Sequence, residues 1–358
     1  GYTTPEPDPE GNRSFPYSCL DIHRRNGWMV AIKGHSRYIW NTETYIGCNL
    51  YGRYLNYGNI HILPTHPKHQ TSNITNTYGG YAVNGWDWNH FSGTTAIVYP
   101  IPELKANILN ISDVSGYEEM LMSDEAFCNG LSLENNGIWG MKLHSHDKYD
   151  GSLHARKSVF CFDDRIICLG SNICSATPDH EVHTTLFQVE VDSTMSADVL
   201  LSPIADHYGN YYYPAEGQNL YHTCGLQHSF HEETAKPTEG YFSLLAINHG
   251  AAPRNASYQY AIQVQASQPM TDKQMAASYA VLQQDSSAHI VRDEVSGMIG
   301  YVLFEPNTVL KNNRPCLVMT KPTDSGLVVS ISDPDLHLYE GSKEEYDENG
   351  KRKEQIVY

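Results

Sequence analysis

The chain has 358 residues and a formal net charge of −17, from 24 lysines and arginines against 41 aspartates and glutamates. This charge makes a general electrostatic affinity for nucleic acid or an anionic membrane unfavourable. Only 18% of the residues are charged, whereas tyrosines number 25, glycines 27 and prolines 18. Such a composition favours many short strands joined by turns, and the length favours two domains, so we predict an all-β protein.

The first residues, GYTTPEPDPEGN, combine proline and acidic side chains without an apolar period. This pattern predicts a linker over residues 1–13 that arrives from an upstream part of the protein. The chain also begins with Gly1 rather than methionine. We therefore expect a processed or excised piece of a longer polypeptide.

From Ser14 onward, short apolar runs recur with turn signals between them, which is typical of stacked antiparallel sheets. The predicted strands lie at 28–34, 59–63, 95–101, 137–143, 157–162, 165–171, 182–191, 241–248, 258–264, 288–293, 300–306, 316–322 and 326–332. None of these runs has the length of a membrane span, so we expect no membrane partner.

One helix is predicted in PMTDKQMAASYAVLQQ, where Thr271 can cap the first turn. Met275, Tyr279 and Leu282 follow at helical spacing and predict a packing face. A domain boundary is placed just before this helix, near Gln268. The prediction is thus a central domain at 14–267 and a smaller domain at 268–358.

Eight cysteines occur without any Cys-x-x-Cys pair, which argues against a zinc ribbon or a redox motif. Cys161 and Cys168 flank a hairpin that turns at Asp163 and Asp164. In a two-residue turn register, Cys161 faces Ile166 and Cys168 faces Val159, so the two cysteines are not partners. Free, buried thiols are predicted.

The segment HSHDKYDGSLH gathers His144, His146 and His154 with Asp147 and Asp150. The histidines lack the helical or zinc-finger spacing of known zinc motifs, so an exposed polar loop is favoured. The two aspartates could take a calcium ion together with backbone carbonyls, although no EF-hand pattern is present.

In GWDWNHFSGTT, Trp86 and Trp88 alternate with Asp87 and Asn89. On a strand the two indoles would share one face and the polar side chains the other, an arrangement that suits sugar binding. The alternative is that both tryptophans are core and the polar pair closes a turn before Gly93. The dominance of large aromatics in cores favours this second interpretation.

Longer blocks of sequence are more specific. In order, they are YIWNTETYIGCNLYGRYLNYG, GWDWNHFSGTTAI, ARKSVFCFDDRIICLGSNICS, VHTTLFQ, KPTEGYFSLLAINHG and RNASYQYAI. Between about Ser14 and Asp333 they resemble the C-terminal half of polysaccharide lyase family 8, and within it the broad-specificity chondroitin sulfate ABC lyases.

The resemblance implies a large antiparallel super-sandwich of the galactose-mutarotase-like type followed by a small C-terminal β-sandwich. An N-terminal α/α toroid, which carries the family's catalytic His, Tyr and Arg, would lie upstream of Gly1. The implied activity is β-elimination at uronic acids of chondroitin sulfate, dermatan sulfate or a related glycosaminoglycan. It further implies a secreted or periplasmic bacterial enzyme that requires no cofactor, although a divalent cation such as calcium could bind.

The family's β-domain glutamate lies in a Trp-x-x-Glu-x-Tyr segment, and the matching residue is Glu43. The resemblance makes Glu43 the catalytic candidate. A carboxylate there can orient the family's catalytic arginine and hold the catalytic tyrosine and histidine in useful protonation states. The residue pattern alone also allows an ordinary strand glutamate paired with Arg53. Arg53 could bind a sulfate or uronate oxygen, or it could hold Glu43 in place.

The predicted substrate-binding residues are Arg53, Trp86, Trp88, Asn89 and His90. The family usually has arginine where this chain has His90, and a neutral imidazole would weaken an ion pair or sulfate contact.

Because the chain is acidic, glycan binding would depend on a local cluster such as Lys33, Arg37 and Arg53 together with the toroid. The chain by itself is therefore predicted to be nearly inactive. The alternative function is a non-catalytic carbohydrate-binding or scaffolding module.

Overall fold

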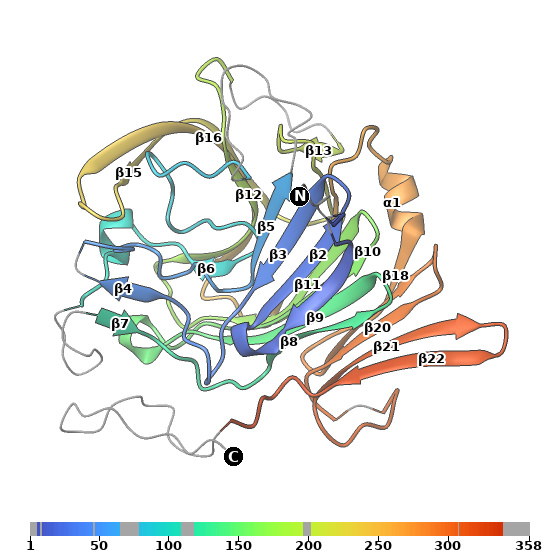
Figure 1. Cartoon of the computed structure of the whole chain (residues 1–358). Helices are drawn as coiled ribbons and strands as arrows, with labels where there is room; N and C mark the ends of the chain where they lie inside the picture. Colours follow the sequence, from blue (N-terminus) through green and yellow to red (C-terminus); the bar gives the residue numbers. More distant parts are fainter. Residues whose placement is uncertain are drawn as a thin grey trace, which may run out of the picture.

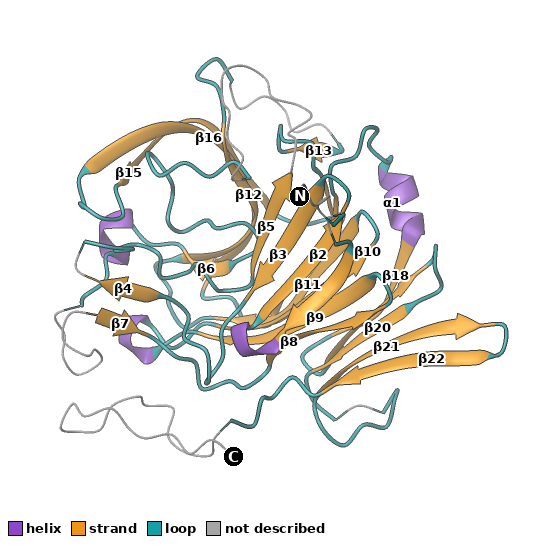
Figure 2. Cartoon of the chain, in the orientation of Figure 1, coloured by secondary structure: helices purple, strands orange, loops and turns teal. Residues whose placement is uncertain are grey.

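The computed structural model describes residues 6–7, 9–45, 47–64, 79–108, 118–195, 202–306 and 308–338. Strands are its main regular structure and helices are short, as Figure 2 shows. Every strand pairing among the described residues is antiparallel. The prediction of an all-β fold built from antiparallel sheets is confirmed.

Three sheets form the large domain. In spatial order, the first holds β1 (Gly11–Phe15), β2 (Leu20–Arg25), β3 (Trp28–Lys33) and β5 (Asn59–Pro64). The second, again in spatial order, holds β13 (Ile204–Ala205), β14 (Tyr211–Pro214), β17 (Ala256–Gln263), β11 (Arg165–Cys174), β10 (His154–Phe162), β9 (Asn136–His144) and β8 (Cys128–Leu133). The third runs from β15 (Leu220–Phe230) through β16 (Pro237–Ala251) and β12 (Glu181–Glu190) to β6 (Thr95–Ile97).

Two smaller sheets complete the fold (Figure 1). A five-stranded sheet holds β18 (Tyr279–Gln284), β19 (Ala288–Asp293), β20 (Ile299–Leu303), β21 (Cys316–Thr323) and β22 (Gly326–Ser332). A two-stranded sheet pairs β4 (Glu43–Tyr45) with β7 (Glu118–Met120) on the opposite side of the molecule from β21 and β22. The helices are α1 (Asp272–Ser278) and the 3-10 turns Pro16–Ser18, Ile101–Leu104 and Asp147–Tyr149.

The seven-stranded sheet is the middle layer, and both of its faces are buried. Along β10, Val159 and Cys161 pack into the core shared with the other two large sheets, whereas Phe160 and Phe162 pack against the five-stranded sheet. Successive side chains of a strand point to opposite faces, so a doubly covered strand must be apolar at every position. This requirement explains why VFCF is a continuous apolar run.

Buried polar contacts join the five-stranded sheet to the middle layer. Arg165 Nη1 of β11 lies 2.8 Å from Asp293 Oδ1 of β19, and both side chains are almost fully buried. On β19, His289 is held between two serine hydroxyls of the middle sheet, at 2.7 Å from Ser158 and 2.8 Å from Ser171. These contacts hold the two packed sheets in a fixed position relative to each other.

The predicted helix is shorter in the structure than in the sequence pattern. It begins as expected, with a capping box between Thr271 and Gln274, but it ends at Ser278. The next residues form β18, in which Tyr279 and Val281 pack toward the core while Leu282 is 48% exposed. Pairing with β19 overrides the helical pattern, because a strand satisfies its backbone groups through its neighbour.

The predicted linker also ends earlier than expected. Strand β1 begins at Gly11, and the side chain of Asn12 donates to the buried Asp21 Oδ2 at 2.6 Å. Residues 11–13 therefore belong to the fold and not to a linker. Residues 1–5 and 8, and the acidic stretch 339–358, lie outside the described residues.

The predicted hairpin register and free thiols are confirmed, but the predicted burial holds for only four of the eight cysteines. The hairpin pairs Cys161 with Ile166 and Val159 with Cys168, which is the predicted register. All eight cysteines are free, and Cys19, Cys128, Cys161 and Cys168 are buried, whereas Cys48 is exposed. Among the described residues, no helix has the length and apolarity needed to cross a membrane.

Candidate active site

Glu43 lies at the start of β4 with its side chain exposed. Because side chains alternate along a strand, Thr44 points inward, and Tyr45 stands on the same face as Glu43. The Tyr45 hydroxyl donates a 2.5 Å hydrogen bond to Glu43 Oε1. A carboxylate that accepts from a neighbouring phenol is held in one orientation, so this short strand presents a positioned acid group to solvent.

The turn after β4 holds the backbone of Glu43. Asn49 adopts a left-handed backbone conformation, with φ of 54°, and its Nδ2 donates to the Glu43 carbonyl at 3.0 Å. The Thr44 hydroxyl donates back to the Asn49 carbonyl at 3.2 Å. A Cβ at Gly52 would clash with the Asn49 side chain, so the glycine leaves room for this brace. Sequence analysis used Tyr45 only as part of the Trp-x-x-Glu-x-Tyr segment and gave no role to Tyr45, Asn49 or Gly52.

Arg53 does not brace Glu43. Its Nη2 donates to the carbonyl oxygens of Glu103 and Leu104, at 3.1 and 3.3 Å. Its guanidinium carbon lies 3.6 Å from the centre of the Tyr149 ring, a close cation–π contact. In the described part of the chain no ion pair joins Arg53 to Glu43, so the pairing that the residue pattern allowed is not formed. Binding of sulfate or uronate by Arg53 stays a prediction.

A buried polar cluster lies beyond Arg53. The Tyr149 hydroxyl donates to Glu119 Oε2 at 2.7 Å, and Lys148 Nζ lies 2.5 Å from the same oxygen. Burial first, and then the neighbouring Glu119 carboxylate, raise the pKa of Tyr149. Glu119 belongs to β7, the partner strand of β4, so the cluster ties that strand to the loop between β9 and β10.

The histidine-rich segment is this loop. It joins β9 to β10 through the turn at Asp147–Tyr149, and His144 stacks on His154 with ring centres 4.0 Å apart. Among the described residues no group of three or more His, Cys, Asp or Glu is arranged to hold a metal ion. What the loop contributes is Lys148 and Tyr149, which sequence analysis did not select.

Trp86 and Trp88 lie in a loop and not in a strand, and they are 4% and 2% exposed. Asp87 Oδ1 accepts from the Asn89 backbone N–H at 3.0 Å and closes a turn. The interpretation in which the tryptophans are core and the polar pair closes a turn is confirmed. Sequence analysis missed that both indoles line a pocket.

Asn89 and His90 are engaged inside the protein. Asn89 Nδ2 donates to the Tyr99 carbonyl at 3.0 Å. His90 lies between Asp87 Oδ2 at 2.8 Å and His183 Nδ1 at 3.0 Å, and both Asn89 and His90 are buried. Neither side chain is placed to meet a ligand at the surface, and their predicted role in substrate binding stays a prediction.

In the described part of the chain, the three residues of the predicted basic cluster contact different partners. Lys33 Nζ donates to the Ser18 and Gly34 carbonyls at 2.6 and 3.0 Å. Arg37 lies over the Tyr38 ring at 5.5 Å, whereas Arg53 stacks on a different ring.

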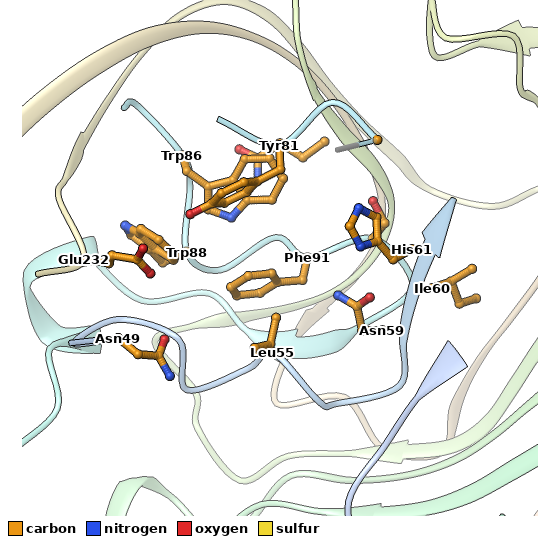
Figure 3. Close-up of a pocket in the computed structure, with 13 residues that line it drawn as sticks. Asn49, Leu55, Asn59, Ile60, His61, Tyr81, Trp86, Trp88, Phe91 and Glu232 are labelled. Atoms are coloured by element: carbon orange, nitrogen blue, oxygen red, sulfur yellow. The ribbon is translucent and has the colours of Figure 1, made fainter. Parts of the chain in front are cut away.

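A pocket of about 280 Å³ adjoins the site (Figure 3). Trp86, Trp88 and Phe91 face one another around it, and Glu232 lies beside Trp88. Asn49 also lines it, so the residue that braces the Glu43 backbone borders the pocket as well. The site therefore consists of an exposed, positioned carboxylate on β4 beside an aromatic pocket.

Comparison with known protein families identifies two matching domains. Residues 10–275 match the super-sandwich domain of polysaccharide lyase family 8, and residues 280–338 match its C-terminal β-sandwich domain. The chain belongs to polysaccharide lyase family 8.

Two similar relatives are chondroitin sulfate ABC exolyases. That of Bacteroides thetaiotaomicron is 43% identical over 99% of this chain and 36% of the relative. That of Proteus vulgaris is 36% identical over 99% of this chain and 37% of the relative. The chain thus spans little more than a third of the length of these relatives.

A solved structure supports the fold. The chondroitin AC lyase of Streptomyces coelicolor A3, in complex with chondroitin sulphate, matches with a TM-score of 0.74. The match covers 94% of this chain and 44% of that protein at 18% sequence identity, so it bears on fold alone.

Proposed function

We propose that this chain is the β portion of a glycosaminoglycan lyase that cleaves chondroitin or dermatan sulfate at uronic acids by β-elimination. The observation that carries the proposal is Glu43, an exposed carboxylate held by Tyr45 on β4, in a chain 43% identical to a chondroitin sulfate ABC exolyase.

The chemistry explains why a positioned carboxylate is useful. The uronate C5 proton is weakly acidic, so the site must neutralise the adjacent carboxylate, supply a base for C5 and protonate the departing O4 oxygen. The product carries a 4,5-unsaturated uronic end, and no water is consumed. Glu43 acts by orienting an arginine and holding the tyrosine and histidine in their working protonation states.

The catalytic His, Tyr and Arg belong, in this proposal, to an α/α toroid encoded upstream of Gly1. The toroid is then a partner within the same protein, and the reaction needs both parts. The proposal also includes a secreted or periplasmic bacterial location and no required cofactor, with calcium as an optional ligand.

The test compares the chain alone with the complete protein on chondroitin sulfate, following the ultraviolet absorbance of the unsaturated uronate. We expect almost no signal from the chain and steady turnover from the complete protein. Glu43→Gln in the complete protein should abolish turnover while folding and glycan binding are retained. Glu216→Gln, a change at another exposed glutamate, is the matched control. Strong turnover by the chain alone, or full activity of Glu43→Gln, would contradict the proposal.

The aromatic pocket favours a second candidate, a carbohydrate-binding module without catalysis. In that case Trp86→Ala would weaken glycan affinity, whereas Glu43→Gln would change nothing that can be measured. If Glu43→Gln loses turnover but still binds glycan, the result supports the lyase over the binding module.

A further inference from the structure

We propose that the pocket between Trp86, Trp88 and Glu232 binds the acetamido group of an N-acetylhexosamine residue. This inference rests on the proposed function for its ligand class, since chondroitin and dermatan sulfate alternate uronic acids with N-acetylhexosamines. The Glu43 carboxylate is a separate feature, and nothing in the proposed chemistry uses the pocket.

The walls of the pocket are aromatic. The Phe91 ring centre lies 6.0 Å from that of Trp86 and 6.1 Å from that of Trp88, and Tyr81 meets Trp86 edge-on at 5.0 Å. Packing among these rings fixes the shape of the pocket. Such walls favour a methyl group or the C–H face of a sugar over a charged group.

Trp86, which lines the pocket, carries an unused donor. Its Nε1 is buried and has no hydrogen-bond partner among the described residues. By contrast, the Nε1–H of the neighbouring Trp88 donates a hydrogen bond to the Phe230 carbonyl at 2.8 Å. A buried donor without a partner is unfavourable, so an acceptor oxygen on a ligand would account for it.

Glu232 supplies the acceptor. Burial, followed by the charge of the neighbouring Glu233, raises the pKa of Glu232, so a ligand anion beside this carboxylate would be disfavoured further. Among the described residues that line the pocket, none is a lysine or arginine. His61 is the one basic side chain in the described lining, and the Glu232 carboxylate would repel a sulfate or a uronate carboxylate.

One common glycan substituent combines these requirements. An acetamido group offers a carbonyl oxygen to the Trp86 N–H, an N–H to the Glu232 carboxylate and a methyl group to the aromatic walls. The volume of about 280 Å³ lies just below the usual range of ligand pockets, which starts at roughly 300 Å³, and suits a ligand no larger than one sugar residue. Asn49 then separates the bound residue from the backbone of Glu43 by one side chain.

The test measures binding to the chain itself by ligand-observed NMR, with three methyl glycosides as probes: N-acetylgalactosaminide, galactoside and glucuronide. We expect the acetamido sugar to bind at least about tenfold more tightly than the galactoside, the sum of two modest hydrogen bonds. The glucuronide should not bind. Trp86→Phe keeps an aromatic wall but removes the donor, and it should weaken the acetamido sugar by about fivefold.

Two further variants keep the test decisive. Trp139→Phe removes another buried, unpartnered indole N–H, away from the pocket, and should leave binding unchanged. Glu232→Leu removes the acceptor at a half-buried side chain and should weaken binding of the acetamido sugar.

Equal binding of the galactoside, unchanged binding in Trp86→Phe or no binding of the acetamido sugar would overturn the inference. Turnover by the complete protein is a separate readout. If the pocket binds no sugar, the lyase proposal is therefore unaffected. If the complete protein shows no lyase activity, sugar binding by the pocket can still be measured.

Discussion

The Tyr45 hydroxyl donates a 2.5 Å hydrogen bond to Glu43 Oε1, and the two side chains stand on the same exposed face of β4. The contact spans two residues of one strand, so it forms wherever β4 forms. Tyr45 is therefore a positioning residue for the proposed catalytic carboxylate.

Tyr45→Phe removes only this hydroxyl. A hydrogen bond to a charged group contributes about 1.5–3 kcal/mol, so we expect kcat of the complete protein to fall by roughly tenfold to a hundredfold. KM should change little, because the ring and the backbone stay in place. Steady-state kinetics on chondroitin sulfate measure both, and Tyr17→Phe, at an exposed tyrosine, is the control. An unchanged kcat would show that Glu43 needs no support from Tyr45.

Arg53 makes its described contacts inside the protein, so its replacement should act on stability. Arg53→Lys loses the planar stack on Tyr149 and the paired carbonyl contacts, and we expect the free energy of unfolding to fall by about 1–2 kcal/mol. Urea unfolding measures this, with the exposed Arg13→Lys as control. A much steeper salt dependence of KM in wild type than in Arg53→Lys, with stability unchanged, would instead show that Arg53 binds substrate.

The Arg165–Asp293 contact between the two domains is buried and should be costly to break. Arg165→Met leaves the Asp293 carboxylate without its cation, and we expect a loss of about 3–5 kcal/mol in the free energy of unfolding. Arg292→Met, which breaks the exposed pair with Glu294, should change the free energy of unfolding far less. Equal losses of unfolding free energy in the two variants would mean that the buried pair stabilises the fold no more than the exposed pair does.

His289 should make the interface between the domains sensitive to acid. Burial, outweighing the opposing charge of Asp285, lowers the pKa of His289 to about 3, against about 6.5 in an unfolded chain. Between these values the unfolded chain binds a proton that the folded chain does not, so the free energy of unfolding falls as pH falls from about 6.5 toward 3.

His289→Gln should remove about one proton from this pH dependence, or about 1.4 kcal/mol per pH unit. Equilibrium unfolding at a series of pH values gives the slope. His228→Gln, at a highly exposed histidine, should leave the slope unchanged. An identical slope in wild type and His289→Gln would assign the acid sensitivity to other buried histidines, such as His23 and His249, whose pKa values burial also lowers.

The sequence by itself determined most of the strands and the hairpin register of Cys161 and Cys168. These features depend on neighbours along the chain: alternation of apolar side chains, a two-residue turn and the Thr271 cap. The family resemblance, and not the local pattern, selected Glu43 as the catalytic candidate, through the Trp-x-x-Glu-x-Tyr segment. Reasoning from local pattern placed Tyr279 and Leu282 on a helix, because no local signal reports that β19 offers them a pairing edge.

Only the tertiary structure decided what the charged and aromatic side chains contact. Arg53 is ten residues from Glu43 in sequence, yet it stacks on Tyr149 from the loop between β9 and β10. Trp86 and Trp88 line a pocket together with Glu232, which lies far away along the chain. Such contacts depend on how separate strands and loops are brought together, and a period of two or of 3.6 residues carries no information about a partner a hundred residues away.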